Sequence, residues 1–140
     1  MVHALKEAWR VLKPGGTLID LRPISVDVPL FILTDAGWKS AGCPSQSPDR
    51  VHDQAANRAI RNVIRDGRFS KVKQVYFVTK NYWNTVEELQ ADVDESWKDD
   101  IIVTEEIWQE ARRLFELGSS QRRILFPIRR KLTIYRREEF

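Results

Sequence analysis

The sequence is poor in the residues that build disulfides, metal sites and membrane spans. It has one cysteine, Cys43, and two histidines, His3 and His52, which lie far apart. A single cysteine excludes an internal disulfide and a cysteine-based metal site, and it is typical of a reducing compartment. No apolar stretch approaches the ~20 residues of a membrane-spanning helix, and no basic-then-apolar signal opens the chain. We therefore expect a cytoplasmic protein that binds neither metal nor membrane.

Glycine is also scarce, with 6 in 140 residues, and no G-x-G motif occurs. The pair Gly15-Gly16 follows a predicted helix and precedes a predicted strand. Loops that hold phosphate run in the opposite order, from strand to helix, so that the positive end of the helix faces the anion. This pair lies at the negative end of a helix instead. A nucleotide-binding loop is therefore not expected here.

The beginning of the chain predicts a helix, a turn and a strand. Apolar residues recur at helical spacing on one face of residues 2–12, and charged residues fill the other face. Pro14 ends this helix, because proline disfavours helical geometry at the residue before it. The apolar residues 17–21 then predict a strand.

Helix and strand signals alternate along the remainder of the chain. Helices are predicted over 49–66, from 85 to about 97 and from about 104 to 117, and strands over 69–83 and 124–135. Residues 23–49 are rich in proline, serine and glycine and are expected to form a long loop, disordered around 42–48. The 140 residues are expected to form one domain with its own core. This order of elements is typical of an α/β fold.

Residues 4–19, with the sequence Ala-Leu-Lys-Glu-Ala-Trp-Arg-Val-Leu-Lys-Pro-Gly-Gly-Thr-Leu-Ile, resemble a known family segment. It is the helix, Pro-Gly-Gly turn and strand found midway through class I S-adenosylmethionine-dependent methyltransferases of type 11. The run Thr-Val-Glu-Glu-Leu at 85–89 is similar to the start of the helix after the family's sixth strand. The resemblance covers only the second half of the family fold. Residues 17–21, 72–82 and 128–135 would be its fifth, sixth and seventh strands.

The resemblance implies a truncated Rossmann-like methyltransferase fold. Its sheet would be mixed and three-stranded, in the order 1-3-2 with the last strand antiparallel, and about four helices would pack on it. The family's glycine-rich loop and the acidic residue that hold S-adenosylmethionine have no counterpart in the sequence. The chain is thus expected to be a methyltransferase-like fragment that neither binds the cofactor nor catalyses alone. The alternative is a non-catalytic binding or assembly module. Either a start codon placed late in a longer reading frame or a degraded or split gene would explain such a fragment.

The same resemblance places a substrate site at the rim of the sheet, where open α/β sheets bind ligands beyond the carboxyl ends of parallel strands. Four residues reach that rim on the implied topology: Arg22, Tyr82, Trp83 and Arg129. An aromatic pair between two arginines suits a small acidic aromatic methyl acceptor. The alternative is that these side chains only pack the loops. No catalytic, cofactor-binding or metal-binding residue is predicted.

The implied topology also predicts a partner. Without the first half of the family fold, the first strand has an unpaired edge and an apolar helix face lies uncovered, which together favour association. We expect a homodimer, or a complementing chain that covers this edge.

Arginine clusters offer one further interpretation, a nucleic-acid surface. Arginines recur at helical spacing within 58–68 and crowd the end of the chain. The members are Arg58, Arg61, Arg65, Arg68, Arg122, Arg123, Arg129, Arg130, Lys131, Arg136 and Arg137. The formal net charge is only +3 and no nucleic-acid-binding motif is present. A solvated helix face and a strand edge guarded by charge are therefore favoured.

Overall fold

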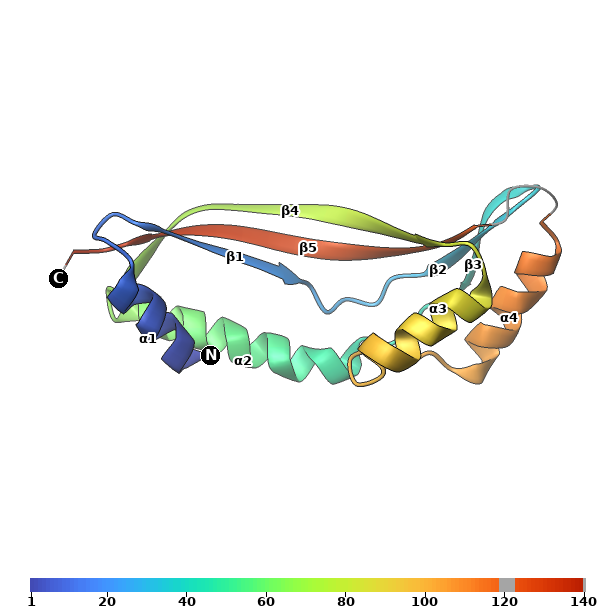
Figure 1. The fold of residues 1–140 in the computed structure, drawn as a ribbon, viewed down its shortest axis with the longest axis horizontal. Coiled ribbons are helices and arrows are strands. Elements are labelled where there is room, and N and C mark those ends of the chain that lie inside the picture. Colours follow the sequence, from blue (N-terminus) through green and yellow to red (C-terminus); the bar gives the residue numbers. More distant parts are fainter. Residues whose placement is uncertain (119–122, 140) are drawn as a thin grey trace. The chain divides into compact units, whose positions relative to one another are not determined.

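A computed structural model describes residues 1–118 and 123–139 of the chain (Figure 1). Four α-helices, one π-helical segment and five strands alternate within these residues. In chain order they are α1 (Val2–Val11), β1 (Thr17–Pro23), β2 (Leu30–Thr34), β3 (Gly37–Gly42), α2 (Ser47–Arg65), β4 (Phe69–Trp83), α3 (Val86–Asp92), η1 (Val93–Trp97), α4 (Glu105–Glu116) and β5 (Ile124–Arg137).

The strands form one five-stranded antiparallel sheet in the order β1-β5-β2-β3, with β4 also paired to β5. The prediction of a three-stranded mixed, Rossmann-like sheet in the order 1-3-2 is therefore wrong. The last strand, β5, takes three partners. It pairs with β1 from Arg130 to Arg136, with β2 at Ile124 and Leu125, and with β4.

The two strands missing from the prediction form a hairpin within residues 23–49, the expected loop. Thr34 pairs with Gly37, which leaves Asp35 and Ala36 as a two-residue turn. Gly37 has a positive φ of 96°, which only glycine adopts at little cost. The apolar run at 30–33 becomes a strand because the hairpin packs beside β5, where Leu30 and Ile32 are fully buried. This tertiary pairing has no local signature in the sequence.

Pro127 lies inside β5, although proline cannot donate a hydrogen bond to a ladder. The pairing of β5 explains the position. Contacts to β2 end at Leu125 and contacts to β1 begin at Arg130, so Pro127 falls where neither strand is its partner. The sequence left open whether this strand is continuous or interrupted, and the structure has it continuous from Ile124 to Arg137.

The chain divides into two compact units, and β4 and β5 contribute to both. The first unit comprises residues 1–24, 51–77 and 129–139, and the second comprises residues 25–50, 78–118 and 123–128. The single domain expected over residues 1–140 thus has two centres of packing, each with its own apolar cluster.

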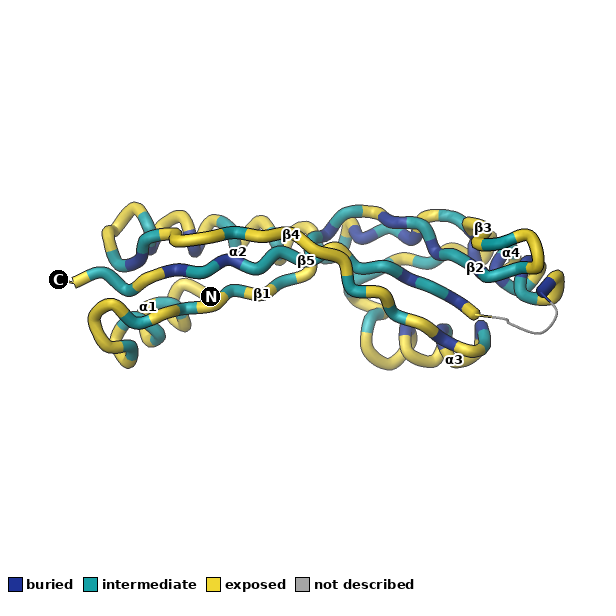
Figure 2. The backbone as a smooth tube through the Cα atoms, turned by 90° about the horizontal axis from the view of Figure 1, so that it is seen from above, coloured by how far each residue is buried: buried dark blue, intermediate teal, exposed yellow. Residues whose placement is uncertain are grey.

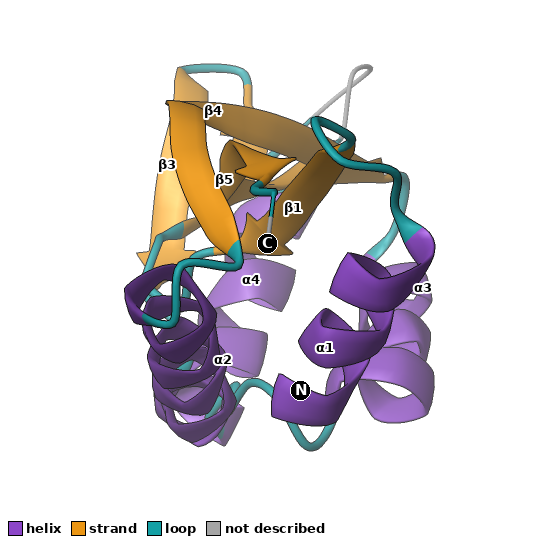
Figure 3. Cartoon of the chain, turned by 90° about the vertical axis from the view of Figure 1, so that its left-hand side faces the viewer, coloured by secondary structure: helices purple, strands orange, loops and turns teal. Residues whose placement is uncertain are grey.

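In the first unit, α1 and α2 lie on the same face of the strands (Figures 1 and 3). The predicted helix face packs there, with Leu5, Trp9 and Leu12 against a buried cluster. The cluster contains Ile60, Val63, Phe69 and Tyr135. The turn between α1 and β1 uses Gly15 with a positive φ of 75°. The helix, turn and strand predicted from the opening motif are therefore confirmed.

In the second unit, the hairpin and the ends of β4 and β5 pack against α3, η1 and α4. Thr85 caps α3 by accepting a hydrogen bond from the N–H of Glu88. Thr104 caps α4 in the same way through the N–H of Ile107. Ala111 of α4 is fully buried, which lets the helix approach the strands closely.

None of the helices described is both long and apolar enough to cross a membrane.

Candidate functional site

Arg22, one of the four predicted substrate residues, is held by a polar network in the first unit. Its Nε donates to both carboxylate oxygens of Asp20, at 2.9 and 3.0 Å. Its Nη2 donates to Asn57 Oδ1 at 3.0 Å, and its Nη1 lies 3.6 Å from Asp53 Oδ1. Lys131, the residue opposite Arg22 on β5, also donates to Asn57 at 3.4 Å. These partners hold the guanidinium between β1 and α2, with only 14% of the side chain exposed.

This network continues to a buried tyrosine on β5. Thr133 and Tyr135 lie opposite Asp20 and Leu18, and both are buried. Burial raises the pKa of the Tyr135 phenol, and a hydrogen bond with Thr133 opposes that shift. The arrangement is that of a packed polar layer under a sheet rather than an open binding site.

Tyr82 and Trp83, the predicted aromatic pair, belong to the second unit and have different surroundings. Trp83 is buried, donates its indole N–H to Asp92 at 2.6 Å, and meets the Trp97 ring edge-on at a centroid distance of 5.8 Å. Tyr82 is half exposed and lies 6.4 Å from the Trp38 ring. Neighbouring residues of a strand point to opposite faces. The pair therefore does not form one aromatic surface.

Arg129, the fourth predicted residue, is exposed at the start of the first unit's part of β5. Its backbone carbonyl accepts a hydrogen bond from the Ile24 N–H at 2.8 Å. The substrate role of Arg22, Tyr82, Trp83 and Arg129 stays a prediction, and the structure gives Arg22 and Trp83 protein partners of their own.

A surface that sequence reasoning missed lies on the other face of the first unit's strands, opposite α1 and α2. Ile19 and Leu21 of β1 are 60% and 52% exposed there. Their cross-strand partners on β5 are Ile134 and Leu132. We call these four side chains, together with Val75 and Phe77 of β4, the helix-free face. Figure 1 shows no described element covering it.

The two β4 residues belong to this surface by strand alternation. Gln74 accepts a hydrogen bond from Thr133, which lies on the helix-covered side with Tyr135. Val75 and Phe77 alternate with Gln74 and therefore point the opposite way. They are 37% and 39% exposed, and most of β4 is exposed in Figure 2. The signal for this surface was present in the sequence, since residues 17–21 carry apolar side chains on both faces of the strand.

Basic residues flank the helix-free face. Arg130 and Arg136 occupy the same side of β5 as Leu132 and Ile134, at either end of the apolar pair. Lys73 lies two residues before Val75 on β4, so its side chain points to the same face as Val75. No acidic residue shares these alternating positions within the described parts of β1, β5 and residues 73–77. The surface is therefore apolar at its centre and positively charged at its rim.

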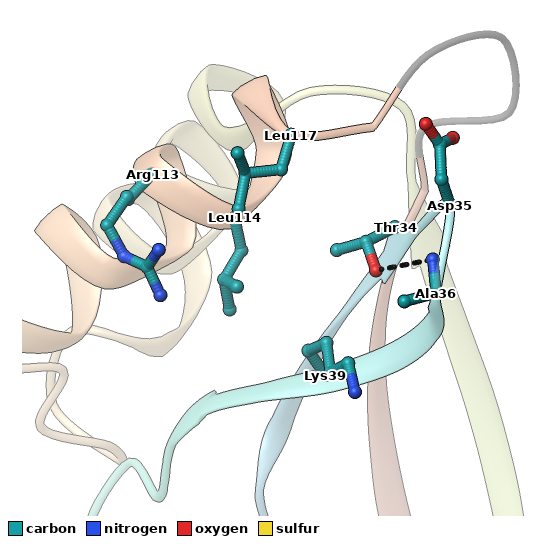
Figure 4. A pocket seen from close by; sticks show the side chains of 7 residues that line it. All are labelled: Thr34, Asp35, Ala36, Lys39, Arg113, Leu114 and Leu117. Atoms are coloured by element: carbon teal, nitrogen blue, oxygen red, sulfur yellow. Dashed lines mark hydrogen bonds between the residues drawn. The ribbon is translucent and has the colours of Figure 1, made fainter.

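An open pocket of the second unit lies between the β2–β3 turn and the end of α4 (Figure 4). It measures about 350 Å³ and is lined by Thr34, Asp35, Ala36, Lys39, Arg113, Leu114 and Leu117. Its Arg113 is already engaged, donating to both carboxylate oxygens of Glu110 at 2.8 and 2.6 Å. The Thr34 hydroxyl accepts from the Ala36 N–H. Two of the polar side chains that line the pocket, Thr34 and Arg113, are thus already bonded within the protein.

The arginine clusters are dispersed. Arg58 and Arg61 line a shallow hollow of about 230 Å³ on α2, while Arg65 donates to Asn62 on the same helix. Arg122 lies outside the described residues. Within the described part of the chain, no group of three His, Cys, Asp or Glu side chains is placed to hold a metal ion.

No protein-family model matches this chain, and no curated protein or solved structure matches it either.

Proposed function

We propose that the chain is a binding and assembly module, related to S-adenosylmethionine-dependent methyltransferases, that docks a second polypeptide on its helix-free face. The observation that carries this proposal is the exposure of Ile19 and Leu21, at 60% and 52%, beside their apolar partners Ile134 and Leu132. Monomeric proteins seldom leave contiguous apolar surface in water without a function. Within the described residues β1 pairs with β5 alone, so its other edge also offers backbone groups to a partner.

The chemistry of the face selects the kind of partner. Its centre is aliphatic, which suits protein side chains better than the aromatic platforms on which nucleic-acid bases stack. Its rim is cationic through Lys73, Arg130 and Arg136. A second copy docking by the same face would set these cations against one another, and like charges across an interface are unfavourable. The partner we propose is therefore a different polypeptide, with an apolar segment flanked by acidic residues.

The relation to methyltransferases is supported by the opening motif. The helix α1, the turn with Gly15 at positive φ and the strand β1 follow residues 2–23 as the family segment would. On this proposal the chain supplies the acceptor side of an assembly, and S-adenosylmethionine is bound only where a complementing polypeptide brings the missing donor pocket.

Site-specific photo-crosslinking tests the docking proposal. The photoreactive residue p-benzoylphenylalanine replaces Ile19, and a control chain carries it at Val51, which is 65% exposed on α2. We expect position 19 to yield a discrete adduct in cells and position 51 to yield none. The protein identified in the adduct must then bind the purified chain in titration.

The substitutions Ile19→Lys and Leu21→Lys together should weaken that titration about tenfold or more, since each exposed aliphatic side chain that becomes buried is worth about 1.5–3 kcal/mol. Val51→Lys should leave it unchanged. An adduct made only of two copies of this chain would overturn the choice of partner. Equal labelling from positions 19 and 51, or no adduct at all, would overturn the docking surface.

A further inference from the structure

Two arginines stack on one tryptophan in the first unit. The guanidinium carbon of Arg137 lies 4.5 Å from the centroid of the Trp9 ring, and that of Arg68 lies 4.9 Å from it. The three residues come from β5, from the turn before β4 and from α1, so the tertiary fold alone brings them together. We call them the Trp9 stack.

The backbones that carry both arginines are fixed. The Arg137 N–H donates to the carbonyl of Gly16 at 2.8 Å, and its own carbonyl accepts from Gly15 at 3.0 Å. The Arg68 N–H donates to Val63 at 3.0 Å, and its carbonyl accepts from Glu138 at 3.0 Å. A ligand meeting these guanidinium groups would therefore lose little chain entropy on binding.

Among the described residues, no carboxylate is paired with the two arginines of the stack. Neither Arg68 nor Arg137 forms an ion pair within the described residues. The nearest acidic neighbour in sequence, Glu138, accepts a hydrogen bond from the Ser70 hydroxyl instead. The Nε atoms of both arginines are buried without a hydrogen-bond partner. Within residues 1–118 and 123–139, no hydrogen bond joins the Nη groups of Arg68 or Arg137 to the protein, so these donors remain for a ligand.

We infer that the Trp9 stack is a binding site for a phosphate monoester dianion. Two guanidinium groups supply charge and paired N–H donors that match the oxygens of a phosphate group. A phosphate carries about −1.5 to −2 charge near neutral pH, which balances two arginines better than a carboxylate does. This inference is independent of the helix-free face, because Arg137, Arg68 and Trp9 lie on the helix-covered side with the cluster around Tyr135.

Inorganic phosphate is the probe, titrated into the full chain at constant ionic strength with chloride as the reference anion. We expect the melting temperature to rise with the logarithm of phosphate concentration and Trp fluorescence to change in the same range. Arg137→Gln and Arg68→Gln should each lower the apparent affinity about tenfold or more, because each removes a charge-assisted contact. Arg136→Gln is the matched control, since Arg136 lies one residue away on the opposite face of β5, and it should leave the affinity within about twofold of the unsubstituted chain.

Arg137→Lys keeps the charge and guards against a variant that fails to fold. Lysine cannot donate two parallel hydrogen bonds, so this variant should retain its circular dichroism and still bind phosphate more weakly. The inference is overturned if phosphate gives the original chain no stabilisation beyond chloride. It is also overturned if Arg137→Gln and Arg136→Gln change the apparent affinity for phosphate equally.

Discussion

Arg22 and Asp20 lie two residues apart on β1 and face the same side, where the Arg22 Nε donates to both oxygens of the Asp20 carboxylate. Their side chains are 14% and 15% exposed. A residue expected at a substrate rim is thus tied to a carboxylate of its own strand. The contribution of Arg22 to the stability of the fold can therefore be measured by substituting Arg22 and its partner.

Replacing Arg22 by methionine should destabilise the chain by about 1–3 kcal/mol, because the poorly exposed Asp20 carboxylate would lose its partner. Replacing both residues, as Arg22→Met with Asp20→Leu, should cost less than Arg22→Met alone. Urea unfolding followed by circular dichroism measures both values. A single variant as stable as the original chain would contradict the network.

Trp83 is a core tryptophan and Trp38 is a surface one, so their removal should change stability by different amounts. Trp83→Ala should cost about 3–5 kcal/mol, because it leaves a cavity beside Trp97 and removes the donor to Asp92. Trp38→Ala should cost about 1 kcal/mol or less, since Trp38 is 42% exposed and contacts Tyr82. Thermal unfolding of the two variants side by side gives the comparison. Equal losses would mean that Trp83 is not a core residue.

Substitutions at Gly37 and Gly42 distinguish the stability cost of backbone strain from the cost of a steric clash. Both have positive φ, at 96° and 125°. A Cβ at Gly37 would meet nothing within 4 Å, whereas one at Gly42 would lie 2.9 Å from Ile107 Cγ1. Gly37→Ala should cost about 1–2 kcal/mol from the backbone alone, and Gly42→Ala should cost more.

The excess loss at Gly42 should disappear when Ile107 is shortened. In an Ile107→Ala background, which is itself destabilised, adding Gly42→Ala should cost no more than Gly37→Ala does in the original chain. Urea unfolding of the four chains of this double-mutant cycle yields the coupling. Strict additivity would contradict the close approach of β3 and α4.

Tyr135 should make stability depend on alkaline pH. Its folded pKa is raised, first by burial, so the folded chain holds the phenolic proton after the unfolded chain releases it. The contribution is fully present below the ordinary tyrosine pKa of about 10 and is lost as pH rises through the folded pKa. Tyr135→Phe should remove this part of the alkaline loss, whereas Tyr82→Phe at an exposed position should not. Urea midpoints measured from about pH 8 to about pH 11 report the difference.

S-adenosylhomocysteine should give no saturable heat when titrated into the isolated chain. The sequence lacks the glycine-rich loop that binds the methionine part of this ligand in class I methyltransferases, the family that residues 4–19 resemble. Isothermal calorimetry provides the measurement. Saturable binding at micromolar concentration would show that the chain carries a donor pocket of its own.

Local sequence determined those elements whose signals lie within a few residues. Pro14 and Gly15 set the turn after α1, Thr85 and Thr104 set the helix caps, and the apolar run at 69–83 set β4. Each depends on backbone geometry or a hydrogen bond between close neighbours in the chain. The helix-free face could also have been foreseen, since a strand with apolar residues on both faces requires a partner on both.

Tertiary structure alone decided the sheet and the Trp9 stack. β2 and β3 form because their hairpin finds β5, some 90 residues further along the chain, and Arg68 and Arg137 meet on Trp9 only once β4, β5 and α1 are in place. Strand pairing is stabilised by contacts between distant segments. Local sequence therefore does not decide whether an apolar run such as residues 30–33 forms a loop or a strand. The sequence by itself determined which segments are helical and where they end, and long-range pairing decided how many strands there are and which charged side chains share a site.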